Sequence, residues 1–278
     1  MRPNHMQQEL TWEIQTEPMR TLSGASTNKK AILRSDTGTM LGFVGKDYAP
    51  VYNTQLMRLV NRLTEDGVFR LVGYDEFKEG KLILAYLEYD AKDRRFGGFP
   101  MREYLILGNS HDGSRPFYAG TGCSLIRCEN QFYSTLELFK KKHTSILEIS
   151  DFELKEMVMQ YKGQSKELYS SFEGLDTIPV NRNVVKQLVN ALQDSMRWDS
   201  RLDNRREERP LSPAIQRLQM SIDREMDALG ENAFGLFNGV TWYTTHEMRN
   251  TNTAFNRLDG AANRINQIAY RFCMALKK

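Results

Sequence analysis

The sequence predicts an α+β fold, in which an N-terminal antiparallel sheet of hairpins with one packed helix precedes a helical C-terminal part. Three observations predict it. Short apolar and aromatic runs separated by turn residues continue to about residue 130. A single stretch of helical period interrupts them after residue 53, and beyond residue 130 the apolar residues recur with a helical period. We therefore expect an N-terminal arm over 1–30, a sheet domain over 31–130, and a helical region over 131–278 that packs on the sheet.

The first elements follow from turn and capping residues. The first thirty residues surround isolated apolar positions such as Trp12 with polar ones, so we expect a mobile arm or an early edge strand. From Ala31 a strand-turn-strand pattern begins, and Asp36-Thr37-Gly38 supplies its turn. Asn53 offers an N-cap for a helix that Asp66-Gly67 ends.

Two hairpins complete the predicted sheet. The first joins the runs 69–77 and 81–89 through Lys78-Glu79-Gly80, with the glycine in the left-handed conformation. The second joins 104–107 and 117–127 across the polar stretch 109–116.

The remaining chain has the pattern of helices. Phe132, Leu136, Phe139, His143 and Ile146-Leu147 share one helical face, and an apolar series from 152 to 161 continues it. A break at 177–180 precedes a short helix over 184–192, and the mixed-charge run 197–210 suits an exposed loop. Two helices close the chain, one from about 212 to 229 and the other built on 265–276.

Composition excludes several classes of protein. With 278 residues the chain can bury a core without disulfides or metals. The 38 basic and 35 acidic residues leave a net charge of +3, which is too mild to demonstrate a nucleic-acid or membrane partner. No apolar run reaches the roughly 18 residues of a spanning helix, so we expect a cytoplasmic protein with no membrane partner. Cys123, Cys128 and Cys273 are interpreted as core residues in a reducing compartment.

Three stretches carry a family resemblance through their order. They are Gly45-Lys46-Asp47-Tyr48-Ala49-Pro50-Val51-Tyr52-Asn53, then Asn109-Ser110-His111-Asp112-Gly113-Ser114 with the segment 122–130 after it, and Asn232-Ala233-Phe234-Gly235-Leu236-Phe237-Asn238-Gly239-Val240-Thr241-Trp242-Tyr243-Thr244-Thr245-His246. From about residue 40 to the C-terminus, the chain resembles the phage/plasmid-like proteins of the domain-of-unknown-function 932 family. The resemblance implies no assigned activity. It implies a role in mobile-element DNA metabolism or in countering host defence, inside a bacterial host cell.

The first stretch offers an anion site. Lys46, Tyr48 and Tyr52 would project beside the N-terminus of the helix at Asn53, where backbone N–H groups favour an anion such as phosphate. The alternative is a strand-to-helix turn with the tyrosines packed in the core.

The second stretch is the sharpest polar cluster. Asn109, Ser110, His111, Asp112 and Arg115 lie in one hairpin loop, and a histidine beside a carboxylate is suited to general acid-base chemistry. The same residues could instead contact a ligand or nucleic acid. They could also form only a turn, since Asp-Gly is a strong hairpin signal.

The third stretch puts Trp242, His246 and Arg249 on one helical face, with Tyr243 beside it. Such a face can stack bases and pair with phosphate. Core packing of the same residues is the alternative.

Basic clusters recur along the chain, most compactly at Arg94, Arg95 and Phe96, which we interpret as a basic hairpin tip. Rings at 86, 89, 99 and 104 are interleaved with such clusters, a composition typical of a groove that tracks phosphates and stacks bases. Ordinary solvated faces are the alternative.

Motifs for metals and cofactors are absent from the sequence. Its four histidines lack metal-ligand spacing, and neither a phosphate-binding Gly-rich loop ending in Lys-Ser/Thr nor a Gly-x-Ser-x-Gly elbow occurs. We therefore assign no metal, no cofactor and no catalytic residue.

These observations favour a non-catalytic protein that binds single-stranded DNA and anneals or protects it. Self-association through edge strands is also expected. One alternative is a host-interaction, anti-defence protein that binds a bacterial protein, and another is a hydrolase using His111 and Asp112. The predicted nucleic-acid contacts are Lys46, Tyr48, Arg94, Arg95, Phe96, Asn109, His111, Arg115, Trp242, His246 and Arg249.

Overall fold

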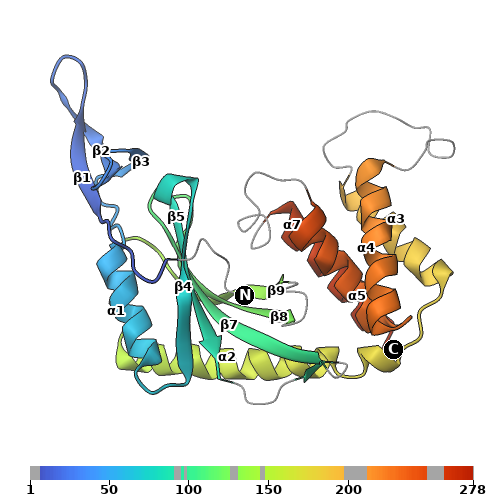
Figure 1. Ribbon diagram of the computed structural model, residues 1–278. Helices are drawn as coiled ribbons and strands as arrows, with labels where there is room; N and C mark the ends of the chain where they lie inside the picture. The colour runs from blue at the N-terminus through green and yellow to red at the C-terminus, as the bar shows by residue number, and fades with distance from the viewer. Residues whose placement is uncertain are drawn as a thin grey trace. The chain divides into compact units, whose positions relative to one another are not determined.

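The computed structural model describes residues 7–90, 95–96, 99–125, 131–144, 148–196, 212–248 and 260–277. The chain divides into two compact units. Unit 1 comprises 1–92, 103–122 and 135–165, and unit 2 comprises 93–102, 123–134 and 166–278. Figure 1 shows the elements of both units.

A three-stranded antiparallel sheet opens unit 1, in the order β1 (Ile14–Arg20), β2 (Ser26–Arg34), β3 (Met40–Gly45). The early edge strand is therefore present as β1, and the turn predicted at 36–38 joins β2 to β3 with Gly38 at a φ of 68°. Side chains alternate between the faces of a strand. One face buries Ile14, Ile32 and Val44, which makes the other face the solvent side.

Helix α1 (Asn53–Thr64) follows this sheet and buries Leu56, Leu59, Val60 and Leu63, the apolar face that its sequence predicts. The expected cap is wrong, because Asn53 is the first helical residue and its side chain is fully buried. A carboxylate from before β1 caps the helix instead.

The second sheet has the order β4 (Phe69–Phe77), β5 (Leu82–Tyr89), β7 (Phe99–Ser110), β8 (Phe117–Leu125), β9 (Gln131–Lys141), and the short β6 (Arg95–Phe96) pairs with β7. The predicted turn between β4 and β5 is confirmed as a 3₁₀ turn over Lys78–Gly80, and Gly80 has a φ of 97°. The boundaries between the units fall within β7, β8, β9 and α2 (Asp151–Phe172).

Strand β9 corrects the helix expected over 132–147. Phe132, Leu136 and Phe139 have the spacing of a helical face, whereas Phe132, Leu136 and Leu138 are separated by even numbers of residues, as on one face of a strand. Pairing with β8 decides between the two periods, because a run with three aromatic residues fits a half-buried sheet surface. Phe132 and Leu138 are both buried.

The other helices agree with the predicted pattern except over 233–242, where no separate helix was predicted. They are α2, α3 (Arg182–Met196), α4 (Pro213–Leu229), α5 (Ala233–Trp242), a π-helical turn (Tyr243–Glu247) and α7 (Ala261–Ala275), with a 3₁₀ turn at Leu175–Thr177. The α+β prediction, an antiparallel sheet followed by a helical C-terminal part, is confirmed. Among the described residues, none of the helices combines the length and apolarity needed to cross a bilayer.

Two cysteines are core residues, as expected. Cys123 and Cys273 are buried, and burial raises the pKa of the Cys273 thiol to about 12. Cys128 and the predicted loop over 197–210 lie outside the described residues.

Helices α4 and α5 approach so closely that two α5 positions have no room for a side chain. A Cβ on Gly239 would lie 2.4 Å from the Ile222 Cα, and one on Gly235 would lie 3.2 Å from the Met226 Cα. In contrast, a Cβ on Gly163 of α2 would meet nothing within 4 Å.

We expect Gly239→Ala to lower the free energy of unfolding by about 1–3 kcal/mol, because the helix backbones must separate. Gly163→Ala is the matched control and should raise it by about 0.5–1 kcal/mol, since alanine favours an exposed helix. Urea denaturation of the two variants checks both. Equal effects would contradict the close packing of α4 on α5.

Candidate functional site

The Trp12 side chain is the centre of a buried polar cluster in unit 1. Only 4% of it is exposed, and its Nε1 donates a hydrogen bond to Glu76 Oε1 at 2.7 Å. The Trp12 carbonyl accepts one from Asn53 Nδ2 at 3.0 Å, and the Arg34 guanidinium carbon lies 4.1 Å from the centre of the ring. The cluster therefore fastens the start of β1 to β4, α1 and β2.

Arg34 is committed to this cluster. Its Nε bonds to Asp36 at 2.7 Å and its Nη1 to Glu76 at 2.6 Å. The hydrogen bond to Asp36, followed by that to Glu76, raises the pKa of Arg34 against the effect of burial. This cation is paired by carboxylates and is not free to meet a phosphate.

Glu13 caps helix α1. Its carboxylate oxygens accept hydrogen bonds from the backbone N–H groups of Asn53 at 2.8 Å and Thr54 at 3.0 Å. An anion at a helix N-terminus is favoured by the unsatisfied N–H groups and by the helix dipole. The site that the sequence suggested for phosphate is thus occupied by the chain's own carboxylate.

His111 is completely buried beside Trp12. Its Nε2 lies 3.0 Å from Asn53 Oδ1, its Nδ1 lies 3.4 Å from Asn109 Nδ2, and its ring meets the indole edge-on at 5.6 Å. Burial lowers the pKa of His111 to about 3. The imidazole is therefore neutral at physiological pH and both its nitrogens face partners within the fold, which describes a structural histidine.

Asp112 organises its own loop. Its Oδ1 accepts hydrogen bonds from Ser110 Oγ at 2.7 Å and from the Ser114 N–H at 2.9 Å. Burial raises the pKa of Asp112, but the bonds from Ser114 and Ser110 outweigh it and lower the pKa. A Cβ on Gly42 would lie 2.8 Å from the Asp112 Cα, so the loop packs directly on β3.

Tyr48 and His143 extend the cluster. Their rings stack at 4.8 Å, and the Tyr48 hydroxyl donates to the Ser110 carbonyl at 3.1 Å. Burial raises the pKa of Tyr48 and lowers that of His143. Tyr48, Asn109 and His111 are thereby brought together, but as packed side chains and not as a surface.

The other predicted contacts are dispersed. Lys46 is exposed after β3, where its N–H donates to the Asn28 carbonyl at 3.1 Å, and Arg115 is half-buried. Arg95 is exposed on β6 in unit 2. Arg94, Arg249 and the side chain of Phe96 lie outside the described residues.

Trp242 and His246 are neighbours at the end of α5, with ring centres 4.2 Å apart. The Arg224 guanidinium carbon lies 4.0 Å from the centre of the same indole. The Arg224 guanidinium and the His246 imidazole therefore both pack on this indole. Trp242 therefore stacks within unit 2.

Three of the rings expected to alternate with cations along the sheet, Tyr86, Tyr89 and Phe99, pack within the fold. Tyr86 is buried, Tyr89 packs on Phe69 at 5.6 Å, and Phe99 lies 6.4 Å from Phe234. The prediction that these sheet aromatics form an exposed stacking surface is wrong.

A different aromatic residue is exposed, on the solvent side of the β1–β2–β3 sheet. The register pairs Phe43 with Ala31 and Ala31 with Glu17, so these side chains share a face. We call it the open face. It carries Gln15, Glu17, Lys29, Ala31, Leu33, Met40 and Phe43.

The open face combines apolar surface with charge. Phe43 is 53% and Met40 46% exposed. Lys29 lies on the same strand as Ala31, and neither it nor the nearby Lys46 forms an ion pair within the part of the chain that is described. Sequence reasoning missed this face because an apolar run such as 40–44 is ordinarily interpreted as core. Alternation along β2 was the signal that could have revealed it.

One comparison with known proteins gives a match. A family model described as a domain of unknown function (DUF932) matches residues 40–269, in agreement with the resemblance in sequence. No curated protein and no solved structure matches the chain.

The buried histidine predicts acid sensitivity. Unfolding restores an ordinary pKa of 6.5 to His111, whereas the folded value is about 3, so the unfolded state binds an extra proton below pH 6.5. Stability is then complete above pH 6.5 and falls with decreasing pH by about 1.4 kcal/mol per pH unit for this group.

Urea denaturation across this pH range tests the point. We expect His111→Gln to remove this part of the slope, and Gln15→Asn, at an exposed residue that does not titrate, to leave the slope unchanged. Identical pH profiles for His111→Gln and the parent chain would show that His111 titrates normally in the fold.

Proposed function

Because the chain belongs to the DUF932 family, whose description assigns no activity, we propose its function from its own surfaces. It binds single-stranded nucleic acid, without catalysis, on the open face of the β1–β2–β3 sheet. The observation that carries the proposal is the exposed ring of Phe43 beside lysines that form no ion pair with any carboxylate of the described residues.

Stacking supplies one part of the affinity. A base can stack on an aromatic ring that projects from a sheet, and such contacts tolerate every sequence because every base has a flat face. Phe43 is the large aromatic side chain of the open face, and Met40 adds apolar surface beside it on β3.

Phosphate contacts supply the rest. Lys29 shares the open face with Phe43, and Lys46 follows β3 next to Asn28. When lysines bind the phosphates of a nucleic-acid strand, counterions are released, so the affinity falls as the salt concentration rises. Glu17 on β1 is the carboxylate of this face and would repel phosphates, so the nucleic-acid strand would lie along β2 and β3.

In this proposal the protein serves a phage or other mobile element in the cytoplasm of a bacterial host, where it anneals or protects single strands. Self-association is part of the same proposal. β1 and β3 are edge strands of their sheet, and unpaired edges are suited to side-by-side assembly.

A stripe on α2 favours a second candidate function, binding of an acidic helix of a host protein. Phe152, Lys155, Met159 and Lys162 lie at spacings of three, four and three, which is one face of a helix. Phe152 is 69% and Met159 72% exposed, and both lysines are exposed. An amphipathic helix with apolar and acidic residues complements this α2 stripe.

Matched variants separate the two candidates. Against an oligo(dT) strand, we expect Phe43→Ala to weaken binding about tenfold to a hundredfold, since a stacked base contributes roughly 1–3 kcal/mol. Lys29→Gln should lower the salt dependence by about 0.7 in slope. Phe152→Ala and Lys155→Gln are the controls and should leave both unchanged. Fluorescence anisotropy at several salt concentrations measures the affinity for oligo(dT) and its salt dependence.

The opposite pattern would contradict the proposal. If oligo(dT) does not bind, or if Phe152→Ala weakens binding and Phe43→Ala does not, the open face is not the nucleic-acid surface. For the second candidate, capture of one host protein should survive Phe43→Ala and be lost in Phe152→Ala.

A further inference from the structure

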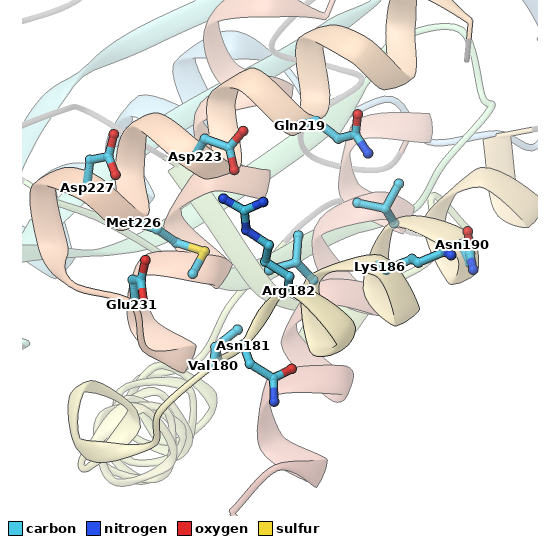
Figure 2. Close-up of a pocket in the computed structure, with 12 residues that line it drawn as sticks. Val180, Asn181, Arg182, Lys186, Asn190, Gln219, Asp223, Met226, Asp227 and Glu231 are labelled. Carbon is cyan, nitrogen blue, oxygen red and sulfur yellow. The ribbon is translucent and has the colours of Figure 1, made fainter. Parts of the chain in front are cut away.

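Unit 2 contains a cavity between α3 and α4, with a volume of about 770 Å³. Figure 2 shows that side chains from both helices project into it. On α3 the lining residues Arg182, Lys186 and Asn190 recur every four residues. On α4 the facing row, Gln219, Asp223 and Asp227, has the same spacing. The size lies within the range of sites that hold small ligands.

The two walls of the cavity have opposite charge. Arg182 and Lys186 make the α3 wall cationic, whereas Asp223, Asp227 and the nearby Glu231 make the other wall anionic. Among the described residues, none of these five side chains forms an ion pair. Side chains of opposite charge thus line facing walls of the cavity without forming ion pairs with one another.

Apolar and amide groups complete the lining. Val185, Val189 and Met226 supply apolar surface, and Asn190 and Gln219 supply amides at one end. Figure 2 shows Arg182 extending into the middle of the cavity, near Asp223. The N-terminus of α3 is already capped, because Asn181 Oδ1 accepts hydrogen bonds from the N–H groups of Asn183 at 3.0 Å and Val184 at 3.1 Å.

We propose that this cavity binds a zwitterion with a cationic side chain, namely a basic amino acid that is either free or at the C-terminus of a peptide. Its carboxylate meets Arg182 and Lys186. Its cationic groups meet Asp223, Asp227 and Glu231, while its aliphatic part lies on the two valines and Met226. Charge-assisted hydrogen bonds of this kind are about twice as strong as neutral ones.

Other ligand classes fit the walls less well. A phosphate dianion would satisfy the two cations but would face three carboxylates. A polyamine would satisfy the carboxylates but would leave Arg182 and Lys186 opposed to it. A metal ion is disfavoured as well, because the described residues contain no group of three metal-ligating His, Cys, Asp or Glu side chains.

Isothermal titration calorimetry with four probes tests the proposal on the full chain. The probes are L-arginine, citrulline, agmatine and Gly-Gly-Arg. Citrulline replaces the side-chain cation with a neutral group of similar shape, and agmatine lacks the carboxylate. We expect L-arginine or Gly-Gly-Arg to bind, and the tighter of the two shows whether the ligand is a free amino acid or a peptide C-terminus. Citrulline and agmatine should bind at least about tenfold more weakly.

Variants locate the binding. Lys186→Gln and Asp227→Asn should each weaken binding of the tighter arginine probe by about tenfold. Lys186→Gln should also reduce the difference in affinity between that probe and agmatine. The exposed Asp176→Asn and Arg264→Gln, elsewhere in unit 2, are the controls. The proposal would be overturned if neither arginine probe bound, or if agmatine bound as tightly as the better arginine probe. It would also be overturned if the control variants lost as much affinity as Lys186→Gln and Asp227→Asn.

Discussion

The fold of unit 1 depends on the burial of one indole, that of Trp12. Its N–H, its carbonyl and its ring face contact Glu76, Asn53 and Arg34, which belong to β4, α1 and β2. A Cβ on Gly80 would lie 2.7 Å from this ring, so the turn between β4 and β5 closes around it. Because these contacts fix one side of the β1–β2–β3 sheet against the rest of the unit, its other side remains open to solvent.

The same constraint separates structural polar groups from those available for binding. Glu13 caps α1, His111 is neutral beside Asn53, and Asp112 satisfies its own turn. His111 and Asp112, the pair that suggested acid-base chemistry in the sequence, therefore both have partners within the fold. What reaches solvent on the open face includes an aromatic ring and ammonium groups, which are the kinds of group that stack on bases and attract phosphate.

Local signals were sufficient for much of the fold. The turn at Lys78–Gly80, the apolar face of α1 and helices α4 and α7 were predictable because each depends on residues close in sequence. β9 was not, since Phe132, Leu136 and Phe139 have a helical spacing, Phe132, Leu136 and Leu138 have a strand spacing, and only pairing with β8 selects the strand. The contacts of Asn53 with Glu13 and His111 span 40 and 58 residues, so no local pattern reports them. Phe43 was missed because sequence gives the alternation of a strand but not which of its faces the fold covers.

Photocrosslinking can show whether single-stranded nucleic acid lies on the open face. A single-stranded oligonucleotide carrying iododeoxyuridine would be irradiated on the full chain, and the crosslinked peptide would be identified by mass spectrometry. Crosslinks are expected in the peptide of β3 that contains Phe43. Crosslinks confined to other segments, such as the one containing Trp242, would contradict it.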